Sequence, residues 1–386
     1  MNATRSHSDE RIVVIGGGLI GLAVAWQLAR RGRSVSVLER DTAGRGASWV
    51  AAGMLAPVSE YGFENEDFLA FGRRSGEAYP AFLDELRTDS GLDVAIDSRG
   101  TLVVGLHRDE VEQIRRVYSF REDKGLPVQW LSGTEARELE PLLSPKVTAA
   151  MWIPDDHQID NRALVAAVKE AFIRVGGELH ERTEVLSLRV RDGRCAGAVT
   201  AEGEHTAETT VLAAGCWSSS IRGIPPEIAP NVRPVKGQIV SLKTDFTYPF
   251  AHVIRTPDVY LLPKGTSRVL IGATEEEMGF DVTPTAGPVM RLIERAWEAV
   301  PSVYDLPIES IDAGLRPGTR DHEPLIGESG MPGLIYATGH YRHGILLAPV
   351  TAYAVSKLVV SGKAPAWLEP FAPSRIHNRE RRAGQP

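Results

Sequence analysis

One stretch of the sequence decides the fold, Arg11-Ile-Val-Val-Ile-Gly-Gly-Gly-Leu-Ile-Gly-Leu-Ala-Val-Ala-Trp26. Its apolar residues 12–15 predict a buried parallel strand, and the apolar run after the glycines predicts a helix. Between them, Gly16, Gly18 and Gly21 have the G-x-G-x-x-G spacing. In a strand–turn–helix context this spacing indicates a dinucleotide site, because glycines allow a tight turn, close approach of a diphosphate and close helix packing. The amides at the start of the helix would then face the diphosphate.

The next predicted strand, residues 34–38, ends at Glu39, about 20 residues beyond the first glycine, as this kind of site requires. A carboxylate there can accept hydrogen bonds from both ribose hydroxyls, and it would repel the 2′-phosphate of NADP. The alternative is a glycine-rich turn in an ordinary α/β core with a solvated Glu39. The complete strand–turn–helix–strand unit favours the dinucleotide site.

The composition of the chain is that of an ordinary globular protein. It has 386 residues, of which 43% are hydrophobic and 24% charged, and a formal net charge of -7. We therefore expect no nucleic acid partner. No apolar run suits a secretory signal or a membrane span, so we expect a cytoplasmic protein. The two cysteines, Cys195 and Cys216, lack metal-ligand spacing and are expected to be small buried residues, and no metal site is predicted.

The order of predicted elements indicates a discontinuous domain organisation within the α/β class. Strand–helix–strand patterns flank two regions of different character, one of them rich in strands separated by short turns. We expect a Rossmann-like dinucleotide domain with an inserted, mostly antiparallel α+β substrate domain. The predicted dinucleotide domain comprises residues 11–79, 151–234 and 311–371, the substrate domain comprises 80–150 and 235–310, and residues 1–10 and 374–386 are tails.

Two further stretches have side chains small enough for close contact with a cofactor. The first contains Ser48, Ala51, Ala52 and Gly53, which could wrap a flat and bulky ligand. The second, residues 213–215, is Ala-Ala-Gly at the end of a predicted strand. The alternatives are a flexible surface loop for the first stretch and a tight strand-to-helix turn for the second.

Four segments together resemble the FAD-dependent amine and amino-acid oxidases of the D-amino-acid oxidase type. They are the opening glycine motif, residues 48–55, Gly314-Leu-Arg-Pro-Gly-Thr319 and Gly339-His-Tyr-Arg-His-Gly-Ile-Leu-Leu347. Within that family, the chain is most similar to the glycine-oxidising members that serve thiamine biosynthesis. The glycine motif alone does not distinguish FAD from NAD, but the family places the later loops around the flavin ring.

The resemblance implies an FAD site built from many parts of the chain. No cysteine accompanies the flavin-facing turn at residues 337–341, so we expect noncovalent FAD. The cofactor contacts implied are Gly16, Gly18, Leu19, Ile20, Gly21, Glu39, Arg40, Ser48, Ala51, Ala52, Gly53, Met54, Val185, Ala214, Gly215, Trp217, Arg316, Gly339, His340, Tyr341, Arg342, Gly344, Ile345 and Leu346.

Oxidation of an amino acid by a flavin calls for a cation that binds the substrate carboxylate. Arg316 is the first candidate, because a guanidinium can hold a carboxylate through two parallel hydrogen bonds; the alternative is a surface ion pair. Tyr260 resembles the family tyrosine whose hydroxyl reaches the substrate, and Arg342 is a second candidate for the carboxylate or the flavin edge. His340 and His343 could suggest a general base, but solvent can take the amine proton, so we expect them to be packed residues or cofactor anchors.

The resemblance implies that glycine, sarcosine or a small D-amino acid is oxidised to the imine by hydride transfer from Cα to flavin N5. O2 would be reduced to H2O2, and the imine would serve proteins of thiazole synthesis; we expect a homo-oligomer. The alternatives are a D-amino-acid or proline dehydrogenase with a non-oxygen acceptor, and a non-catalytic FAD-binding protein.

One departure from the family is Glu275-Glu-Glu277, where relatives can carry an apolar pocket residue. If Glu275 points into the pocket, it would disfavour acidic substrates. If it faces solvent, it gives no information about substrate preference.

Overall fold

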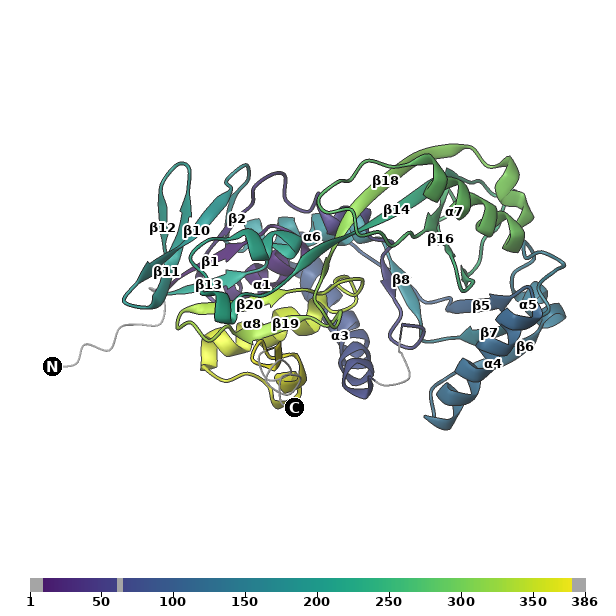
Figure 1. Ribbon diagram of the computed structural model, residues 1–386, viewed down its shortest axis with the longest axis horizontal. Helices are drawn as coiled ribbons and strands as arrows, with labels where there is room; N and C mark the ends of the chain where they lie inside the picture. Colours follow the sequence, from purple (N-terminus) through teal and green to yellow (C-terminus); the bar gives the residue numbers. More distant parts are fainter. Residues whose placement is uncertain (1–9, 61–64, 377–386) are drawn as a thin grey trace, which may run out of the picture.

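The computed structural model of the protein describes residues 10–60 and 65–376. The parts of the predicted tails at residues 1–9 and 377–386 lie outside the described residues. Two large sheets make up the two halves of the molecule (Figure 1).

The first half is built on a six-stranded sheet with the order β19-β20-β13-β1-β2-β9. Its strands are β19 (Leu325–Glu328), β20 (Leu334–Thr338), β13 (Thr209–Leu212), β1 (Arg11–Ile15), β2 (Ser34–Leu38) and β9 (Glu178–His180). All neighbours pair in parallel except β19, which is antiparallel to β20. Because β1 lies between β13 and β2, the loops after these three strands meet at one edge of the sheet.

Helices cover this sheet and bury its apolar side chains. Those that contact the sheet are α1 (Leu19–Ala29), α6 (Asn161–Arg174) and α8 (Ala348–Ser361), and α1 packs on both of the others. Helix α3 (Glu66–Ser90) packs on α6 and α8. Every residue of α1 except Ile20 is buried, as expected of a helix that is apolar on all sides. The carboxylate of Asp160 caps α6 by accepting hydrogen bonds from the backbone amides of Arg162 and Ala163.

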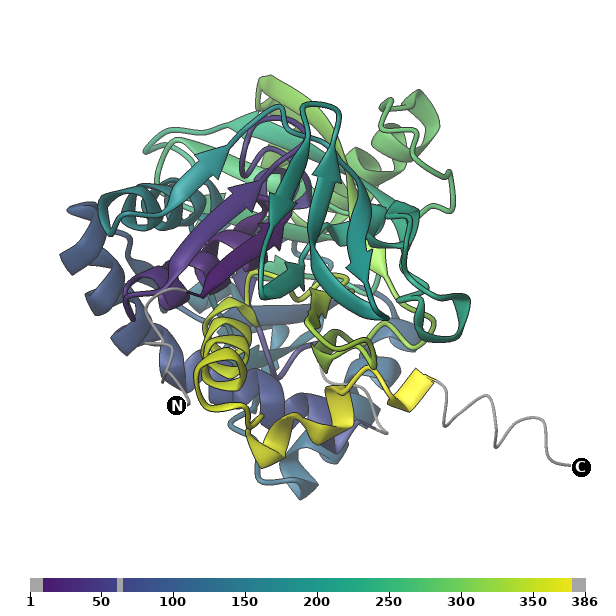
Figure 2. The ribbon, with the colours of Figure 1, turned by 90° about the vertical axis from the view of Figure 1, so that its left-hand side faces the viewer.

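A small three-stranded sheet packs beside β1 and β13 (Figure 2). It consists of β10 (Val185–Arg191), β11 (Arg194–Thr200) and β12 (Glu204–Thr206). Asp192 and Gly193 form the β10–β11 turn with φ of 49° and 71°, the left-handed conformations that a tight hairpin requires.

The second half is built on an eight-stranded sheet with the order β18-β14-β17-β16-β15-β5-β7-β6. Its strands are β18 (Ile308–Gly318), β14 (Arg233–Lys243), β17 (Arg268–Gly272), β16 (Tyr260–Lys264), β15 (Val253–Arg255), β5 (Thr101–Gly105), β7 (Ala149–Ile153) and β6 (Gln129–Ser132). Apart from the parallel pair β15–β5, its neighbours are antiparallel. The predicted α/β fold with a mostly antiparallel second part is confirmed.

Three helices pack on the eight-stranded sheet, and short elements complete the chain. The helices are α4 (Arg108–Asp123), α5 (Gly133–Leu139) and α7 (Ala286–Ala299). A small sheet contains β3 (Met54–Leu55), β8 (His157–Ile159) and β4 (Ile96–Asp97). The remaining elements are α2 (Ala47–Val50) and the 3-10 turns η2 (Gly215–Ser220), η3 (Pro226–Ile228), η4 (Pro301–Asp305) and η5 (Ala366–Phe371).

The predicted domain boundaries fall inside continuous elements. The boundary at 79/80 lies within α3, and those at 150/151, 234/235 and 310/311 lie within β7, β14 and β18. Phe82 and Leu86 of α3 belong to the core of the first half, whereas β7 and β18 pair in the eight-stranded sheet. We therefore propose that the division follows the ends of these elements, because one strand cannot be shared between two cores.

Candidate active site

The glycine turn after β1 brings three strands and one helix into close contact. A Cβ on Gly16, whose φ is +108°, would lie 2.4 Å from the carbonyl oxygen of Ala213. A Cβ on Gly21 would lie 2.0 Å from the carbonyl oxygen of Gly16. On Gly18, in contrast, an added Cβ would meet only the Ser48 hydroxyl, at 3.5 Å. Gly16 and Gly21 are thus required by packing, while Gly18 faces the space where a diphosphate would approach.

Two side chains contact the amides of this turn. The Glu39 carboxylate at the end of β2 accepts hydrogen bonds from the amides of Gly17 (2.7 Å) and Asp41 (2.9 Å). The Ser48 hydroxyl accepts a hydrogen bond from the amide of Leu19 at 3.0 Å, at the N-terminus of α1. The predicted carboxylate and the predicted small-residue stretch therefore meet at the same helix end, where anions bind favourably.

Further predicted cofactor contacts lie close to this turn. The Arg40 guanidinium lies 4.3 Å from the centre of the Trp217 ring, and Phe280 stacks on that ring at 5.6 Å. The other predicted contacts in this region are Val185, which is buried at the start of β10, and Ala214 and Gly215, which follow β13.

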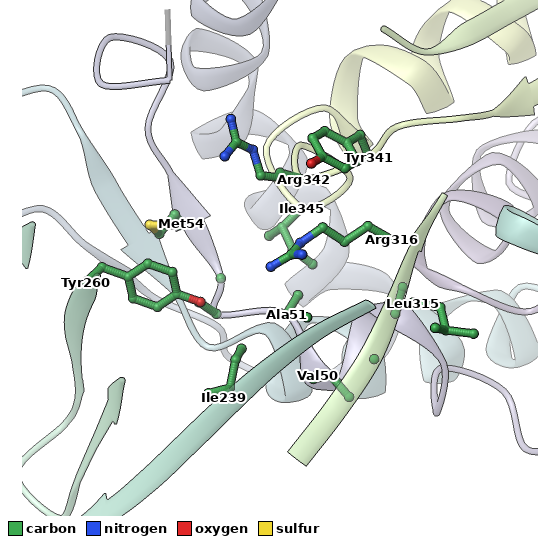
Figure 3. Close-up of a pocket in the computed structure, with 15 residues that line it drawn as sticks. Val50, Ala51, Met54, Ile239, Tyr260, Leu315, Arg316, Tyr341, Arg342 and Ile345 are labelled. Atoms are coloured by element: carbon green, nitrogen blue, oxygen red, sulfur yellow. The ribbon is translucent and has the colours of Figure 1, made fainter. Parts of the chain in front are cut away.

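The other predicted residues gather at a cavity of about 100 Å³ between the two halves (Figure 3). Its walls contain nine residues expected from the sequence: Ala51, Ala52, Gly53, Met54, Tyr260, Arg316, Tyr341, Arg342 and Ile345. They also contain six residues outside the predicted contacts. Val50, Gly314 and Leu315 lie in the segments that carry the family resemblance, whereas nothing in the sequence indicated Ala47, Gly237 and Ile239. Five segments that are separate in the sequence thus form one pocket.

Arg316 extends from β18 into the middle of this pocket (Figure 3). Its Nη1 donates to the carbonyl oxygens of Thr274 (2.9 Å) and Lys236 (3.4 Å). The guanidinium lies directly over Gly237, because an added Cβ there would be 2.4 Å from Nη2. Within the described part of the chain, its hydrogen bonds go to carbonyl groups and no carboxylate pairs with it. The cation is therefore held in place without being neutralised.

Tyr260 reaches into the pocket from β16, on the opposite wall (Figure 3). Its ring lies on Gly272, where an added Cβ would be 2.2 Å from the hydroxyl oxygen. Burial raises the pKa of Tyr260 to about 12. The hydroxyl is therefore protonated at neutral pH and can donate a hydrogen bond to an anionic ligand.

Arg342 lines the pocket but, unlike Arg316, is paired with a carboxylate. Its Nη2 lies 3.4 Å from the Glu60 carboxylate, which also accepts a 2.6 Å hydrogen bond from Arg255. Neither Glu60 nor Arg255 was expected from the sequence. No spacing could have revealed them, because the three residues come from separate segments that meet only after folding.

Tyr341 has an unusual environment for a buried tyrosine. It adopts a φ of 48°, and its ring stacks on His322 at 4.2 Å. Burial and the nearby Glu275 carboxylate raise the pKa of Tyr341 to about 12. Tyr341 thus lines the pocket with its hydroxyl close to the Glu275 carboxylate. Glu275 itself is exposed rather than buried in the pocket.

The remaining predicted cofactor contacts in segment 339–346, together with His343, face the protein core. His340 is buried and hydrogen-bonds with Thr351 of α8 at 3.0 Å, and His343 packs against Phe68 at 4.4 Å. Burial lowers the pKa of His340 to about 3 and that of His343 to about 4, so both are neutral. Leu346 is also buried, and Gly339 and Gly344 flank the turn. Cofactor contact by these residues stays a prediction, and their side chains support the turn that presents Tyr341, Arg342 and Ile345.

The residues present fit FAD. The close-packed glycines, the Ser48 hydroxyl at the helix end and the Glu39 carboxylate suit its diphosphate and ribose. The small residues Ala51, Ala52 and Gly53 leave room for its flat ring. Within residues 10–60 and 65–376, no cluster of His, Cys, Asp and Glu could hold a metal ion, and no helix is long and apolar enough to span a membrane.

Comparison with known proteins gives a consistent result. The family model described as "FAD dependent oxidoreductase" (DAO) matches residues 11–358. The chain is 36% identical to a protein named glycine oxidase from Geobacillus kaustophilus, over 94% of this chain and 96% of the relative. It is 34% identical to a bifunctional protein ThiO/ThiG from Trichormus variabilis, over 95% of this chain but 55% of that relative, so it spans about half of that protein.

Solved structures share the fold over nearly the whole chain. The glycine oxidase of Geobacillus kaustophilus superposes with a TM-score of 0.88 at 35% identity, over 95% of this chain and 99% of that one. An L-proline dehydrogenase from P. horikoshii superposes with a TM-score of 0.82 at 25% identity, over 96% of this chain and 98% of that one.

Proposed function

Because the chain belongs to the DAO family of FAD-dependent oxidoreductases and is an FAD-dependent amino-acid oxidase, we propose that it oxidises glycine and other small amines or D-amino acids to imines. O2 is the electron acceptor in this proposal and H2O2 the second product. The relatives named glycine oxidase support this substrate class.

The observation that carries the proposal is the Arg316 guanidinium in the pocket. Hydrogen bonds to carbonyl groups fix the position of this guanidinium. It lies across the pocket from the Tyr260 hydroxyl (Figure 3). A substrate carboxylate can accept two hydrogen bonds from the guanidinium and one from the hydroxyl. These contacts direct the substrate Cα toward the wall formed by residues 51–54.

The chemistry of the reaction asks little of the side chains beyond binding and orientation. When bound, FAD supplies the acceptor for the hydride that leaves the substrate Cα. Among the described residues that line the pocket, none is Asp, Glu or His. We therefore propose that the amine loses its proton to solvent, and that Arg316 and Tyr260 orient the substrate. The mostly apolar and small walls exclude water from the reacting atoms.

The proposal is tested by an anaerobic substrate screen read from the flavin absorbance. Glycine, sarcosine and small D-amino acids should bleach the oxidised flavin band, and readmission of O2 should restore it with formation of H2O2. If none of these compounds bleaches the flavin, the proposed substrate class is wrong.

A second candidate is a dehydrogenase that passes electrons to a quinone or protein acceptor. The structural similarity to an L-proline dehydrogenase, at 25% sequence identity, supports this second candidate. It differs from the first candidate in one measurement: flavin reduced by substrate would then stay reduced in O2 and reoxidise only with an artificial quinone.

We also propose that the imine supplies proteins of thiazole synthesis in thiamine formation. The relatives named ThiO/ThiG support this, because one chain there carries both names. Cytoplasmic location and homo-oligomeric state remain predictions. Exposed apolar side chains on and beside α7, namely Met290 (68% exposed), Trp297 (46%) and Tyr304 (80%), support the association of subunits.

A further inference from the structure

A buried ion-pair cluster lies behind one wall of the pocket. The Glu60 side chain is 7% exposed and contacts two guanidinium groups. One belongs to Arg255 of β15 (2.6 Å), which also donates to the Ser59 hydroxyl at 2.8 Å. The other belongs to Arg342 (3.4 Å), whose side chain is 46% exposed and lines the pocket.

The two arginines of the pocket therefore differ in what holds them. Arg316 is held by carbonyl groups and keeps its full positive charge toward the cavity. Arg342 shares its charge with Glu60. Burial alone would raise the pKa of Glu60, but the nearby guanidinium groups of Arg255 and Arg342 hold it well below its usual range. Glu60 is thus ionised at any pH suitable for an assay.

Resting on the proposed function, we propose that Glu60 restricts this site to substrates with a single carboxylate. The first carboxylate binds Arg316. A second carboxylate on the substrate would have to compete with Glu60 for Arg342, and it would be repelled by the Glu60 charge beside that guanidinium. Glu60 contacts Arg342 rather than the substrate, so it is a positioning and specificity residue.

Glu275 is the other carboxylate near this pocket, and it is the competing explanation. It is exposed, so solvent and salt screen its charge. Glu60 is buried, and its effect on a bound anion is therefore larger. The two carboxylates can be separated by neutralising one at a time.

The test compares ligands that differ by one carboxylate. Glycolate and tartronate are titrated into the FAD-loaded protein, and binding is read from the perturbation of the flavin spectrum. The substrate pairs sarcosine and iminodiacetate, and D-alanine and D-aspartate, are compared by kcat/KM. In the unaltered protein we expect glycolate to bind at least tenfold more tightly than tartronate. In Glu60→Gln we expect this ratio to fall at least tenfold, with a matching gain in relative kcat/KM for iminodiacetate.

Three further variants sharpen the result. Glu277→Gln is the matched control, because Glu277 is exposed and pairs with Arg233 at 3.1 Å; it should leave the ratio unchanged. A fall in the ratio for Glu275→Gln but not for Glu60→Gln would assign the selectivity to Glu275 and overturn the proposal. Glu60→Asp retains the charge and should retain the preference.

The proposal stays testable if Glu60→Gln does not fold. Equal binding of tartronate and glycolate by the unaltered protein would overturn it, as would oxidation of D-aspartate at the rate of D-alanine. If no amino acid reduces the flavin at all, the proposed function fails instead, so the two failures are distinguishable.

Discussion

At the scale of single residues, glycines outside the opening motif shape the substrate pocket. Gly237 lies under the Arg316 guanidinium and Gly272 under the Tyr260 ring, in each case closer than any side chain would allow. On Gly314, an added Cβ would lie 2.9 Å from Val50. These glycines let two polar side chains lie flat against strands, and their partners cannot be recognised before the strands are paired.

Arg316→Ala should lower kcat/KM for amino-acid substrates, because a charged contact to the carboxylate is lost. The lost transition-state stabilisation should be about 2–4 kcal/mol. The loss should appear mainly as a higher KM, measured from steady-state O2 uptake over a range of substrate concentrations. Arg320→Ala, which removes an exposed arginine from the following segment, should have little effect. An unchanged kcat/KM in Arg316→Ala would contradict its role in binding the carboxylate.

At the scale of elements, the β1–α1 unit combines two different requirements for glycine. Gly21 allows α1 to pack on the turn, since an added Cβ would collide with the backbone oxygen of Gly16. Gly18 has an extended backbone (φ −73°, ψ 174°) that any residue can adopt, and an added Cβ would meet only the Ser48 hydroxyl, at 3.5 Å. Gly21 is therefore required for folding, and we infer that Gly18 is required for cofactor binding.

These roles can be separated by two alanine substitutions. Gly21→Ala should destabilise the protein strongly, even without cofactor, because overpacking against backbone typically costs about 1–3 kcal/mol or more. Gly18→Ala should leave the Tm of the apoprotein nearly unchanged but weaken FAD binding, because its methyl group would occupy space beside the diphosphate. Thermal unfolding without FAD and a fluorescence titration with FAD measure the two effects. Equal losses of apoprotein Tm in both variants would refute the distinction.

At the scale of the whole molecule, the C-terminal turn at residues 339–347 joins the pocket to the core of the first half. The hydroxyl of Tyr79 on α3 donates to the carbonyl oxygen of Ile345, and that of Ser75 donates to Leu346 (2.5 Å). His340 and His343 are buried beside these contacts. The core thereby fixes the segment that presents Tyr341 and Arg342.

The buried histidines predict a loss of stability in mild acid. Their folded-state pKa values, about 3 for His340 and about 4 for His343, lie below the ordinary value of 6.5. The unfolded chain therefore binds more protons, and stability decreases as pH falls below about 6.5, by roughly 2 kcal/mol per histidine at pH 5. Thermal unfolding between pH 7 and pH 5 measures the slope. It should be shallower in His340→Gln and His343→Gln, and unchanged in His205→Gln.

Noncovalent binding of FAD is a prediction for the whole molecule. The purified protein should be yellow, and denaturation should release all the flavin into the filtrate. Excess FAD should raise the Tm, because a ligand at 100 times its Kd stabilises a protein by about 2.7 kcal/mol. Flavin that stays with the denatured chain on a filter would contradict noncovalent attachment.

The sequence by itself determined the β1–turn–α1 unit, the Glu39 carboxylate and the likeness of the segments around Arg316 and residues 339–347 to a flavoprotein family. Such features are local, because glycine spacing and apolar periodicity reflect contacts between residues close in the chain. The sequence also indicated Tyr260 and the small residues 51–53, all of which line the pocket.

Only the tertiary structure decided which strands belong to which sheet and which charges pair. It joined β7 to β5 and β18 to β14, so that both strands belong to the eight-stranded sheet. It also brought Glu60 and Arg255 to Arg342, while leaving Arg316 with carbonyl partners. Pairing across such distances depends on how the sheets pack in space, and no periodicity along the chain encodes it. The difference between the two pocket arginines, and with it the proposed choice of substrate, is therefore a property of the folded molecule alone.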